Sequence, residues 1–309
     1  MSDIIVPEGL DVRHDGGVLR ITLDRPERRN ALTDDMIDAL VLLVEAAEND
    51  EAIRVIALAG RGESFCSGFD LGQRGKPEVP PRLGATQRRM RRDVNRLVET
   101  LLECQTPVVA VAQGWIVGLG LALVLAADVA IVADDAVLRA PFARIGMTPD
   151  SGLSWLLPRL VGVARAKQML LLGRDVSGAT AAAWGLVAES VPTADLDGAG
   201  EAIVQELATA ATVAVGLAKD LVHRGLTRDV GDALRSEASA RFERGVDPDG
   251  LTAPEAGFWA AGRTAYAQAL RSYATGTSDG VAQWIVLHAD AIRVGADESR
   301  RIYADLPPA

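Results

Sequence analysis

The sequence is poor in the side chains that most often carry metal, disulfide or triad chemistry. It contains only two cysteines, Cys66 and Cys104, and only three histidines, His14, His223 and His288. The two cysteines lack the spacing of a metal site, so we expect both to be reduced packing residues. The histidines are scattered along the chain and indicate no catalytic triad. The sequence therefore predicts no metal site.

The chain also lacks a long apolar run and an excess of basic charge. Its longest apolar stretch, residues 115–127, is too short to span a bilayer, and its first residues show no secretory signal. With 32 basic and 42 acidic residues, the net charge is -10, which argues against nucleic acid or an anionic membrane as a partner. We therefore expect a cytoplasmic protein with no nucleic-acid and no membrane partner.

Hydrophobic periodicity predicts alternating strands and helices. Alternating apolar residues indicate a strand over residues 19–23, and Thr33 is expected to begin a helix with one apolar stripe. This stripe comprises Met36, Leu40, Leu43, Val44 and Ala47. Further strands are expected at residues 55–58, 108–112 and 129–132. The alternation predicts an α/β fold in which parallel sheets pack against helices.

Residues 113–128, QGWIVGLGLALVLAAD, read as a buried strand that breaks at two glycines directly into an apolar helix. Gly118 and Gly120 remove side-chain bulk at this turn, and the N-terminus of a helix stabilises negative charge. Backbone N–H groups near Leu119 are thus candidates for half of an oxyanion hole. The alternative is that both glycines only permit close helix packing. The pair does not complete a dinucleotide-binding fingerprint, because Leu123 stands where the third glycine would be.

A second candidate segment follows the expected strand at residues 55–58. This segment, residues 65–71 with the sequence FCSGFDL, bends at Gly68. Two such segments can supply two amides to one carbonyl oxygen.

Four stretches of the chain, in the expected order, resemble the crotonase (enoyl-CoA hydratase/isomerase) superfamily. They are residues 24–32, DRPERRNAL; residues 65–71; residues 114–128; and residues 145–162, which contain IGMTPDSG and LPRLVG. The resemblance implies a crotonase-like ββα spiral of parallel sheets. It also implies a C-terminal helical region that forms a homotrimer, often paired into a hexamer.

The same resemblance implies which residues bind the substrate. The N–H groups of Phe69 and Leu119 would hold the thioester oxygen of an acyl-CoA, and no cofactor is expected beyond the CoA that the substrate carries. Arg28 and Arg29 border the CoA site in the family, so we expect them to meet its phosphates. Six arginines of one expected helix are better interpreted as a solvated face. They are Arg82, Arg88, Arg89, Arg91, Arg92 and Arg96.

The chain departs from the family at its acids. Family hydratases carry catalytic glutamates at the positions of Ala122 and Phe142, and neither side chain here can transfer a proton. Asp150 matches the acid position of isomerase-like members, and its context most resembles the ring-epoxide isomerases of phenylacetate catabolism. The resemblance therefore implies an acyl-CoA isomerase in which Asp150 transfers the proton. Its expected pKa is raised by apolar neighbours, namely Ile145, Met147, Leu153 and Trp155.

One other role of Asp150 and two other functions stay open. From local sequence alone, Asp150 reads as a helix N-cap after a proline turn. The chain could instead be an enoyl-CoA hydratase with an atypical acid. It could also be a non-catalytic acyl-CoA binding protein that kept the amides and lost both glutamates.

Two regions are expected along the chain. Residues 1–200 would form the spiral core that binds acyl-CoA, and residues 201–309 the C-terminal helical region. The family pattern is lost from about residue 240, where a loop precedes a longer tail. The tail aromatics either elaborate the trimerisation region or cover the acyl pocket. They include Trp259, Tyr266, Tyr273 and Trp284.

Overall fold

The computed structural model describes residues 4–72 and 94–243 of the chain. Contacts divide the chain into two compact units, Met1–Leu226 and Thr227–Ala309. The expected boundary near residue 200 falls inside helix α7 (Leu196–Thr209), which packs on the sheet of the first unit. In the second unit, the described secondary structure is helix α9 (Val230–Glu243). The tail aromatics lie outside the described residues.

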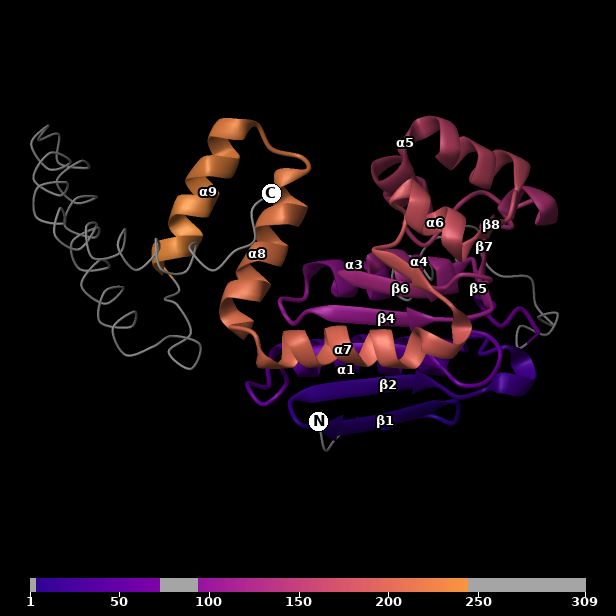
Figure 1. The fold of residues 1–309 in the computed structure, drawn as a ribbon, viewed down its shortest axis with the longest axis horizontal. Coiled ribbons are helices and arrows are strands. Elements are labelled where there is room, and N and C mark those ends of the chain that lie inside the picture. Colours follow the sequence, from indigo (N-terminus) through magenta and orange to yellow (C-terminus); the bar gives the residue numbers. More distant parts are fainter. Residues whose placement is uncertain (1–3, 73–93, 244–309) are drawn as a thin grey trace, which may run out of the picture. The chain divides into compact units, whose positions relative to one another are not determined.

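The main sheet of the first unit has six strands in the order β1-β2-β3-β4-β6-β9 (Figure 1). Its strands are β1 (Leu10–Asp15), β2 (Val18–Leu23), β3 (Val55–Gly60), β4 (Val108–Ala112), β6 (Val129–Ala133) and β9 (Glu189–Val191). Only the pair of β1 and β2 is antiparallel, and the other neighbouring strands of this sheet are parallel. The predicted parallel sheet is therefore confirmed. Strand β1 was not predicted, because its largely exposed residues carry little apolar alternation.

A second sheet has the order β5-β7-β8. Its strands are β5 (Trp115–Val117), β7 (Val137–Arg139) and β8 (Val176–Ser177). Strand β5 ends at Val117, Gly118 follows as the N-cap, and helix α4 (Leu119–Ala126) begins at the next residue. This arrangement confirms the predicted unit of strand, glycine turn and apolar helix, with every residue of α4 buried.

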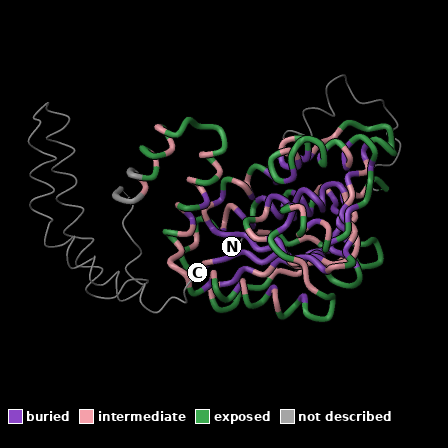
Figure 2. The backbone as a smooth tube through the Cα atoms, turned by 45° about the horizontal axis from the view of Figure 1, so that its top comes forward, coloured by how far each residue is buried: buried purple, intermediate pink, exposed green. Residues whose placement is uncertain are grey.

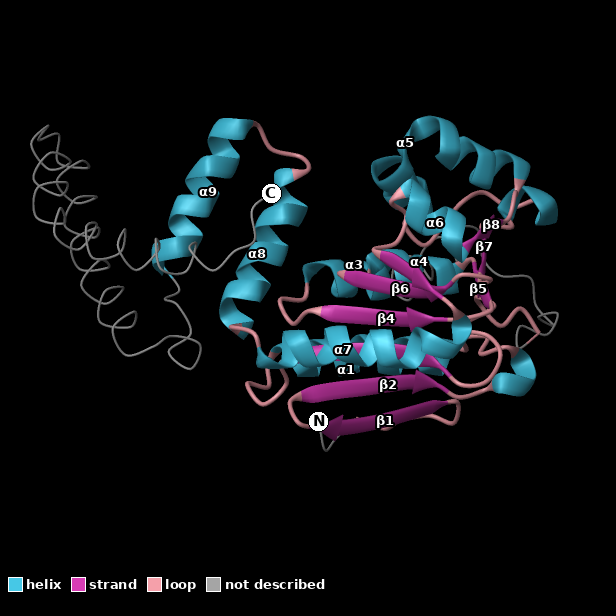
Figure 3. Cartoon of the chain, in the orientation of Figure 1, coloured by secondary structure: helices cyan, strands magenta, loops and turns pink. Residues whose placement is uncertain are grey.

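Helices cover both faces of the main sheet (Figure 3). The remaining helices of the first unit are η1 (Pro26–Arg28), α1 (Asp34–Glu48), α3 (Val94–Glu103), η2 (Phe142–Ile145), α5 (Leu153–Leu172), α6 (Gly178–Trp184), η3 (Thr193–Asp195) and α8 (Thr212–Gly225). Side chains of β3 alternate between two apolar clusters, as the two-residue period of a strand requires. Ile56 and Leu58 join the cluster of α1 and α4, whereas Val55 and Ala57 join Val204 of α7. Figure 2 shows these strands as the buried centre of the unit.

The two longest helix predictions in the N-terminal half are confirmed where the structure describes them. Thr33 is the N-cap of α1, and its hydroxyl accepts the N–H of Met36 at 3.2 Å. All five residues of the predicted stripe are buried. In α3, Arg96 is exposed and pairs with Glu45 at 2.7 Å, as the solvated-face interpretation expects. The other arginines of that prediction lie outside the described residues.

No single helix among the described residues is long and apolar enough to cross a membrane. One bent pair, Thr193–Thr209 with Thr212–Gly225, passes that test by length and composition, with an angle of 107° between its parts. Its first part packs on β3, β4 and β6.

One buried ion pair joins α8 to the sheet. Lys219 Nζ lies 2.8 Å from Asp128 Oδ2, and the two side chains are 5% and 18% exposed. Lys219 also donates to the carbonyl of Leu101 at 2.8 Å, while Asp128 accepts the N–H of Val108 at 2.8 Å. The pair thus connects α8 to the end of α3 and the start of β4.

We expect Lys219→Met to lower the free energy of unfolding by about 3 to 5 kcal/mol, because it leaves the Asp128 carboxylate buried and unpaired. Urea unfolding followed by circular dichroism measures the change. The matched control is Arg96→Met, which removes an exposed ion pair and should cost less than about 1 kcal/mol. Equal losses in the two variants would contradict an anchoring role for Lys219.

Candidate active site

The two glycine segments predicted from separate parts of the sequence lie side by side. The N–H of Cys66 donates to the carbonyl of Trp115 at 3.0 Å, and the N–H of Val117 donates to the carbonyl of Cys66 at 2.9 Å. A Cβ atom on Gly68 would lie 2.9 Å from the carbonyl oxygen of Val117 and 3.5 Å from the nitrogen of Leu119. The tertiary fold therefore brings the first segment against the turn that begins α4.

The direction of the two predicted donors follows from the peptide groups that contain them. The carbonyl of Gly68 accepts the N–H of Leu32 at 2.8 Å. The N–H of Phe69 belongs to the same peptide, and a trans peptide directs its N–H opposite to its C=O. No cis peptide bond occurs among the described residues. The Phe69 N–H therefore points away from Leu32.

The same argument applies to the second donor. The carbonyl of Gly118 accepts the N–H of Ala122 at 3.0 Å, which is the first bond of α4. The N–H of Leu119 on that peptide points out of the helix N-terminus, where it has no intrahelical acceptor. Gly68 has a φ of +98° and Gly118 a φ of +56°, values that suit glycine far better than other residues. Two glycine peptides thus orient the two amides.

Gly120 serves close packing rather than the turn. A Cβ atom there would lie 2.6 Å from both Cβ and the carbonyl oxygen of Cys66. Gly120 therefore permits close helix packing, whereas Gly118 makes the turn. Cys66 is buried, which raises its pKa to about 12, and its sulfur accepts the N–H of Gly68 at 3.3 Å. This agrees with a reduced packing cysteine, and the thiol also fixes the first segment.

Three polar residues with no role predicted from the sequence hold the first segment. Arg25 Nη1 lies 3.0 Å from Asp70 Oδ2, and both side chains are largely buried. The fully buried Asn30 accepts the N–H of Arg25 at 2.8 Å and donates to the carbonyls of Arg61 and Ser64 at 3.0 and 2.7 Å. Asn30 has a φ of +54°, and asparagine tolerates this conformation better than most residues. The sequence signal that could have identified Asn30 was its position in the DRPERRNAL stretch.

The backbone of Arg28 and Arg29 lies beside the first segment. The Ser67 hydroxyl donates to the carbonyl of Arg28 at 3.2 Å, and the Ser67 N–H donates to the carbonyl of Arg29 at 2.9 Å. Both arginine side chains are exposed. Within residues 4–72 and 94–243, neither guanidinium forms an ion pair. Their backbone is thus fixed close to Phe69 while their side chains face solvent.

The turn at Gly118 is bound to Arg139, which forms an ion pair with Asp175. The N–H of Gly118 donates to the carbonyl of Arg139 at 3.0 Å. The Arg139 guanidinium binds both carboxylate oxygens of Asp175 at 2.6 Å and lies 4.6 Å from the ring centre of Trp115. The hydrogen bond from Arg139 lowers the pKa of Asp175. These contacts connect β5, β7 and the start of β8 around the turn that precedes the Leu119 amide.

Asp150 lies between η2 and α5 and is half-buried. Its cap interpretation is wrong: the N-cap of α5 is Gly152, which forms no side-chain cap. The hydroxyl of Ser151 donates to Asp150 Oδ1 at 2.8 Å. Burial raises the pKa of Asp150, and the Ser151 hydrogen bond opposes that rise. The direction of the expected pKa shift is therefore confirmed.

The apolar residues expected around Asp150 differ in their exposure to solvent. Leu153 is fully buried, but Ile145 and Met147 are 51% and 45% exposed. They lie on the short helix η2 and the loop after it, where residues 143–148 face solvent. Ala122 and Phe142, at the positions of the family's glutamates, are 0% and 4% exposed and belong to the apolar core.

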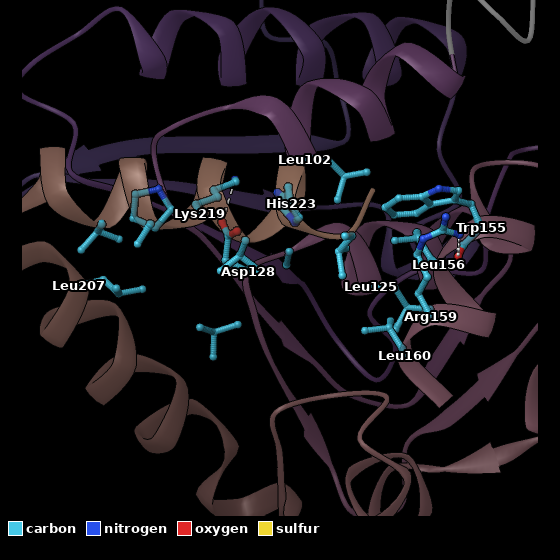
Figure 4. Close-up of a pocket in the computed structure, with 17 residues that line it drawn as sticks. Leu102, Leu125, Asp128, Trp155, Leu156, Arg159, Leu160, Leu207, Lys219 and His223 are labelled. Atoms are coloured by element: carbon cyan, nitrogen blue, oxygen red, sulfur yellow. Dashed lines mark hydrogen bonds and ion pairs between the residues drawn. The ribbon is translucent and has the colours of Figure 1, made fainter. Parts of the chain in front are cut away.

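A cavity of about 500 Å³ lies at the C-terminal end of α4, between α5 and α8. Figure 4 shows the pair of Lys219 and Asp128 on one side of it, with Arg159 stacked on Trp155 on the other. The amides of Phe69 and Leu119 lie at the opposite end of α4, about 12 Å away at the rise of an α-helix. None of the residues that line the cavity lies within residues 65–71 or 115–119, which carry these amides. Within the described residues, no group of three histidine, cysteine, aspartate or glutamate side chains could hold a metal ion.

Comparison with known proteins agrees with this architecture. Residues 13–249 match the family described as enoyl-CoA hydratase/isomerase. The chain is 35% identical over 223 residues to the 1,2-epoxyphenylacetyl-CoA isomerase of Escherichia coli (strain K12), covering 72% of this chain and 84% of the relative. It is 33% identical over 239 residues to the enoyl-CoA hydratase ACTT3 of Alternaria alternata, covering 74% of this chain and 79% of the relative.

A solved structure extends the likeness to the fold. The crystal structure of an enoyl-CoA hydratase from Mycobacterium smegmatis matches with a TM-score of 0.72 at 28% identity, covering 78% of this chain and 93% of that chain. The parallel sheet and its covering helices are thus those of the crotonase fold. The chain belongs to the enoyl-CoA hydratase/isomerase family of the crotonase superfamily.

Proposed function

We propose that this protein is an acyl-CoA isomerase in which Phe69 and Leu119 bind the thioester oxygen and Asp150 moves a proton. The observation that carries the proposal is Asp150, a half-buried carboxylate whose pKa is raised by burial and which does not cap α5. The positions of the hydratase glutamates hold Ala122 and Phe142 instead, both in apolar packing. One carboxylate is enough for a proton shuttle, whereas the usual addition of water uses both glutamates.

The amide pair would stabilise an enolate. When a proton leaves the α or γ carbon, the electron pair of that C–H bond moves toward the thioester oxygen. The N–H groups of Phe69 and Leu119 would donate to that oxygen, and the dipole of α4 would add to the stabilisation. Because Leu32 and Ala122 hold both peptides, the donors need little reorganisation as charge develops.

Asp150 would act as base and then as acid. Its carboxylate takes the proton as the first C–H bond breaks, and the resulting carboxylic acid returns it two carbons away as a new bond forms. This sequence moves a double bond or opens a ring without water, and it regenerates the carboxylate. A partly desolvated carboxylate is the better base for such a step.

Two observations support a CoA thioester as the substrate. The relatives reported above are named for enoyl-CoA or epoxyphenylacetyl-CoA chemistry. Arg28 and Arg29 place exposed guanidinium groups beside the first segment, and guanidinium binds phosphate bidentately. The 35% identity to an epoxyphenylacetyl-CoA isomerase, together with the acid position, favours isomerisation.

A hydratase is the second candidate, because relatives of similar identity are named as hydratases. We would incubate the protein with a panel of unsaturated and epoxidised acyl-CoAs in heavy water. Exchange of α or γ protons without water addition supports the isomerase. Water addition supports a hydratase, and saturable binding without exchange supports a binding protein.

Three further expectations stay predictions. They are a homotrimer or hexamer, a cytoplasmic location, and the absence of a cofactor other than the CoA of the substrate. Sedimentation equilibrium of the full chain measures the first of these directly.

We expect Asp150→Asn to abolish proton exchange, with a loss on the order of a hundred- to ten-thousand-fold, while acyl-CoA affinity is retained. Isothermal calorimetry and exchange in heavy water separate the two effects. Because the pKa of Asp150 is raised in the folded state, its ionised form costs stability above the unfolded pKa. The variant should therefore be at least as stable near neutral pH, and the difference should shrink as pH falls through the raised folded pKa and vanish below the unfolded pKa. Unchanged exchange would refute the assignment.

Gly120→Ala should reduce turnover by about a hundred- to a thousand-fold, the usual effect of losing one oxyanion donor. The added methyl group would lie 2.6 Å from Cβ and from the carbonyl oxygen of Cys66. It would therefore push the start of α4 away from the first segment. Gly198→Ala is the matched control, because Gly198 lies in the first turn of α7 with no atom within 4 Å of its added Cβ. Turnover assays with both variants test this, and equal activity would count against the proposed amide pair.

Hydration of crotonyl-CoA should be slow or absent. Loss of each general acid or base typically costs about a hundred- to ten-thousand-fold, and neither Ala122 nor Phe142 can activate water. Loss of the enoyl thioester absorbance measures the rate, with an authentic hydratase as the positive control. Rapid turnover would place the hydratase first and would require another residue to activate water.

A further inference from the structure

Ser151 adopts a backbone conformation that serine rarely takes. Its φ is +54°, and Arg29 and Asn30 are the other non-glycine residues with positive φ in the described part of the chain. Ser151 is also 2% exposed, so the surrounding packing fixes this conformation. The next residue, Gly152, has a φ of +74°, which makes the turn before α5 left-handed at two successive positions.

Glycine would satisfy this turn at a lower conformational cost, because only glycine adopts positive φ without a steric penalty. What serine adds to glycine is a hydroxyl group. That hydroxyl donates to Asp150 Oδ1 at 2.8 Å. Backbone strain is often found at functional sites, and here it lies beside a half-buried acid, which points to a role for the Ser151 side chain.

We propose that Ser151 is a positioning residue, which holds Asp150 Oδ1 in a fixed hydrogen bond and directs Oδ2 toward the substrate. Among the described residues, the Asp150 side chain has no other hydrogen-bond partner, so Oδ2 is the oxygen left to exchange a proton. A carboxylate with one oxygen fixed loses less rotational freedom when it reaches its reacting geometry. The assignment rests on the proposed role of Asp150 and adds a second residue to it.

The Ser151 hydroxyl also sets how readily Asp150 accepts a proton. Burial raises the pKa of Asp150, the hydrogen bond lowers it, and no charged group contributes to the shift. The charged side chains of the elements that adjoin this turn are Arg144 of η2, Arg159, Arg165 and Lys167 of α5, and Arg96, Glu99 and Glu103 of α3. The hydroxyl is therefore the one described group that stabilises the ionised carboxylate, and its removal should raise the pKa of Asp150.

Two variants separate the hydroxyl from the strain. Ser151→Ala removes the hydroxyl and keeps a side chain at positive φ, while Ser151→Gly removes the hydroxyl and relieves the strain. The Asp150 carboxyl carbon would be titrated by NMR in the resting protein, with Asp150→Asn identifying its signal. The pH profile of proton exchange from an acyl-CoA in heavy water gives a second readout. Thermal melting reports whether each variant is folded.

We expect both variants to raise the Asp150 titration midpoint by about one pH unit, the size of shift that one hydrogen bond to a charged group produces. The acidic limb of the exchange profile should move by the same amount, and Ser151→Gly should melt higher than Ser151→Ala. An unshifted midpoint in the folded glycine variant would overturn the proposal, as would a shift confined to Ser151→Ala. A shifted midpoint in a protein that catalyses no exchange would leave the coupling intact and defeat the isomerase proposal instead.

Discussion

Two peptide bonds, one after Gly68 and one after Gly118, are the constraint on which the rest of the site depends. Each has its carbonyl held by a backbone donor, Leu32 in one case and Ala122 in the other. Because a trans peptide directs its N–H opposite to its C=O, fixing the carbonyls fixes the N–H groups of the following residues. Both glycines need positive φ to make these turns. The site is thus built from backbone, with side chains acting as supports.

The supports come from four separate places in the chain. Asn30 and the ion pair of Arg25 with Asp70 hold the first segment. The pair of Arg139 with Asp175 holds the turn before α4 through the Arg139 carbonyl. Buried polar groups are costly unless they are hydrogen-bonded, and Asn30, Arg25 and Asp70 meet that condition by bonding the segment they fix. The same interactions therefore stabilise the loops and orient the amides.

In contrast to these several supports, a single carboxylate, Asp150, is proposed to transfer the proton. Two positions that carry glutamate in family hydratases are filled by buried apolar side chains, Ala122 and Phe142. Asp150 keeps a carboxylate at partial burial, with its pKa raised by desolvation and moderated by Ser151. An oxyanion site with a single tuned carboxylate suits transfer of a proton within one substrate better than activation of water. This balance supports the isomerase proposal.

The sequence by itself determined the elements whose signals are local. The stripe of α1, the Thr33 cap and the unit from β5 to α4 follow from periodicity and glycine placement, and all are found in the structure. The family-like motifs also led to the proposed roles of Phe69, Leu119, Arg28, Arg29 and Asp150, which stay predictions. Only the tertiary structure decided that residues 66–69 lie against residues 115–119, that Gly152 caps α5, and that Ile145 is exposed. Those features depend on contacts between distant segments and on loop backbone angles, and neither has a period or composition that a single sequence records.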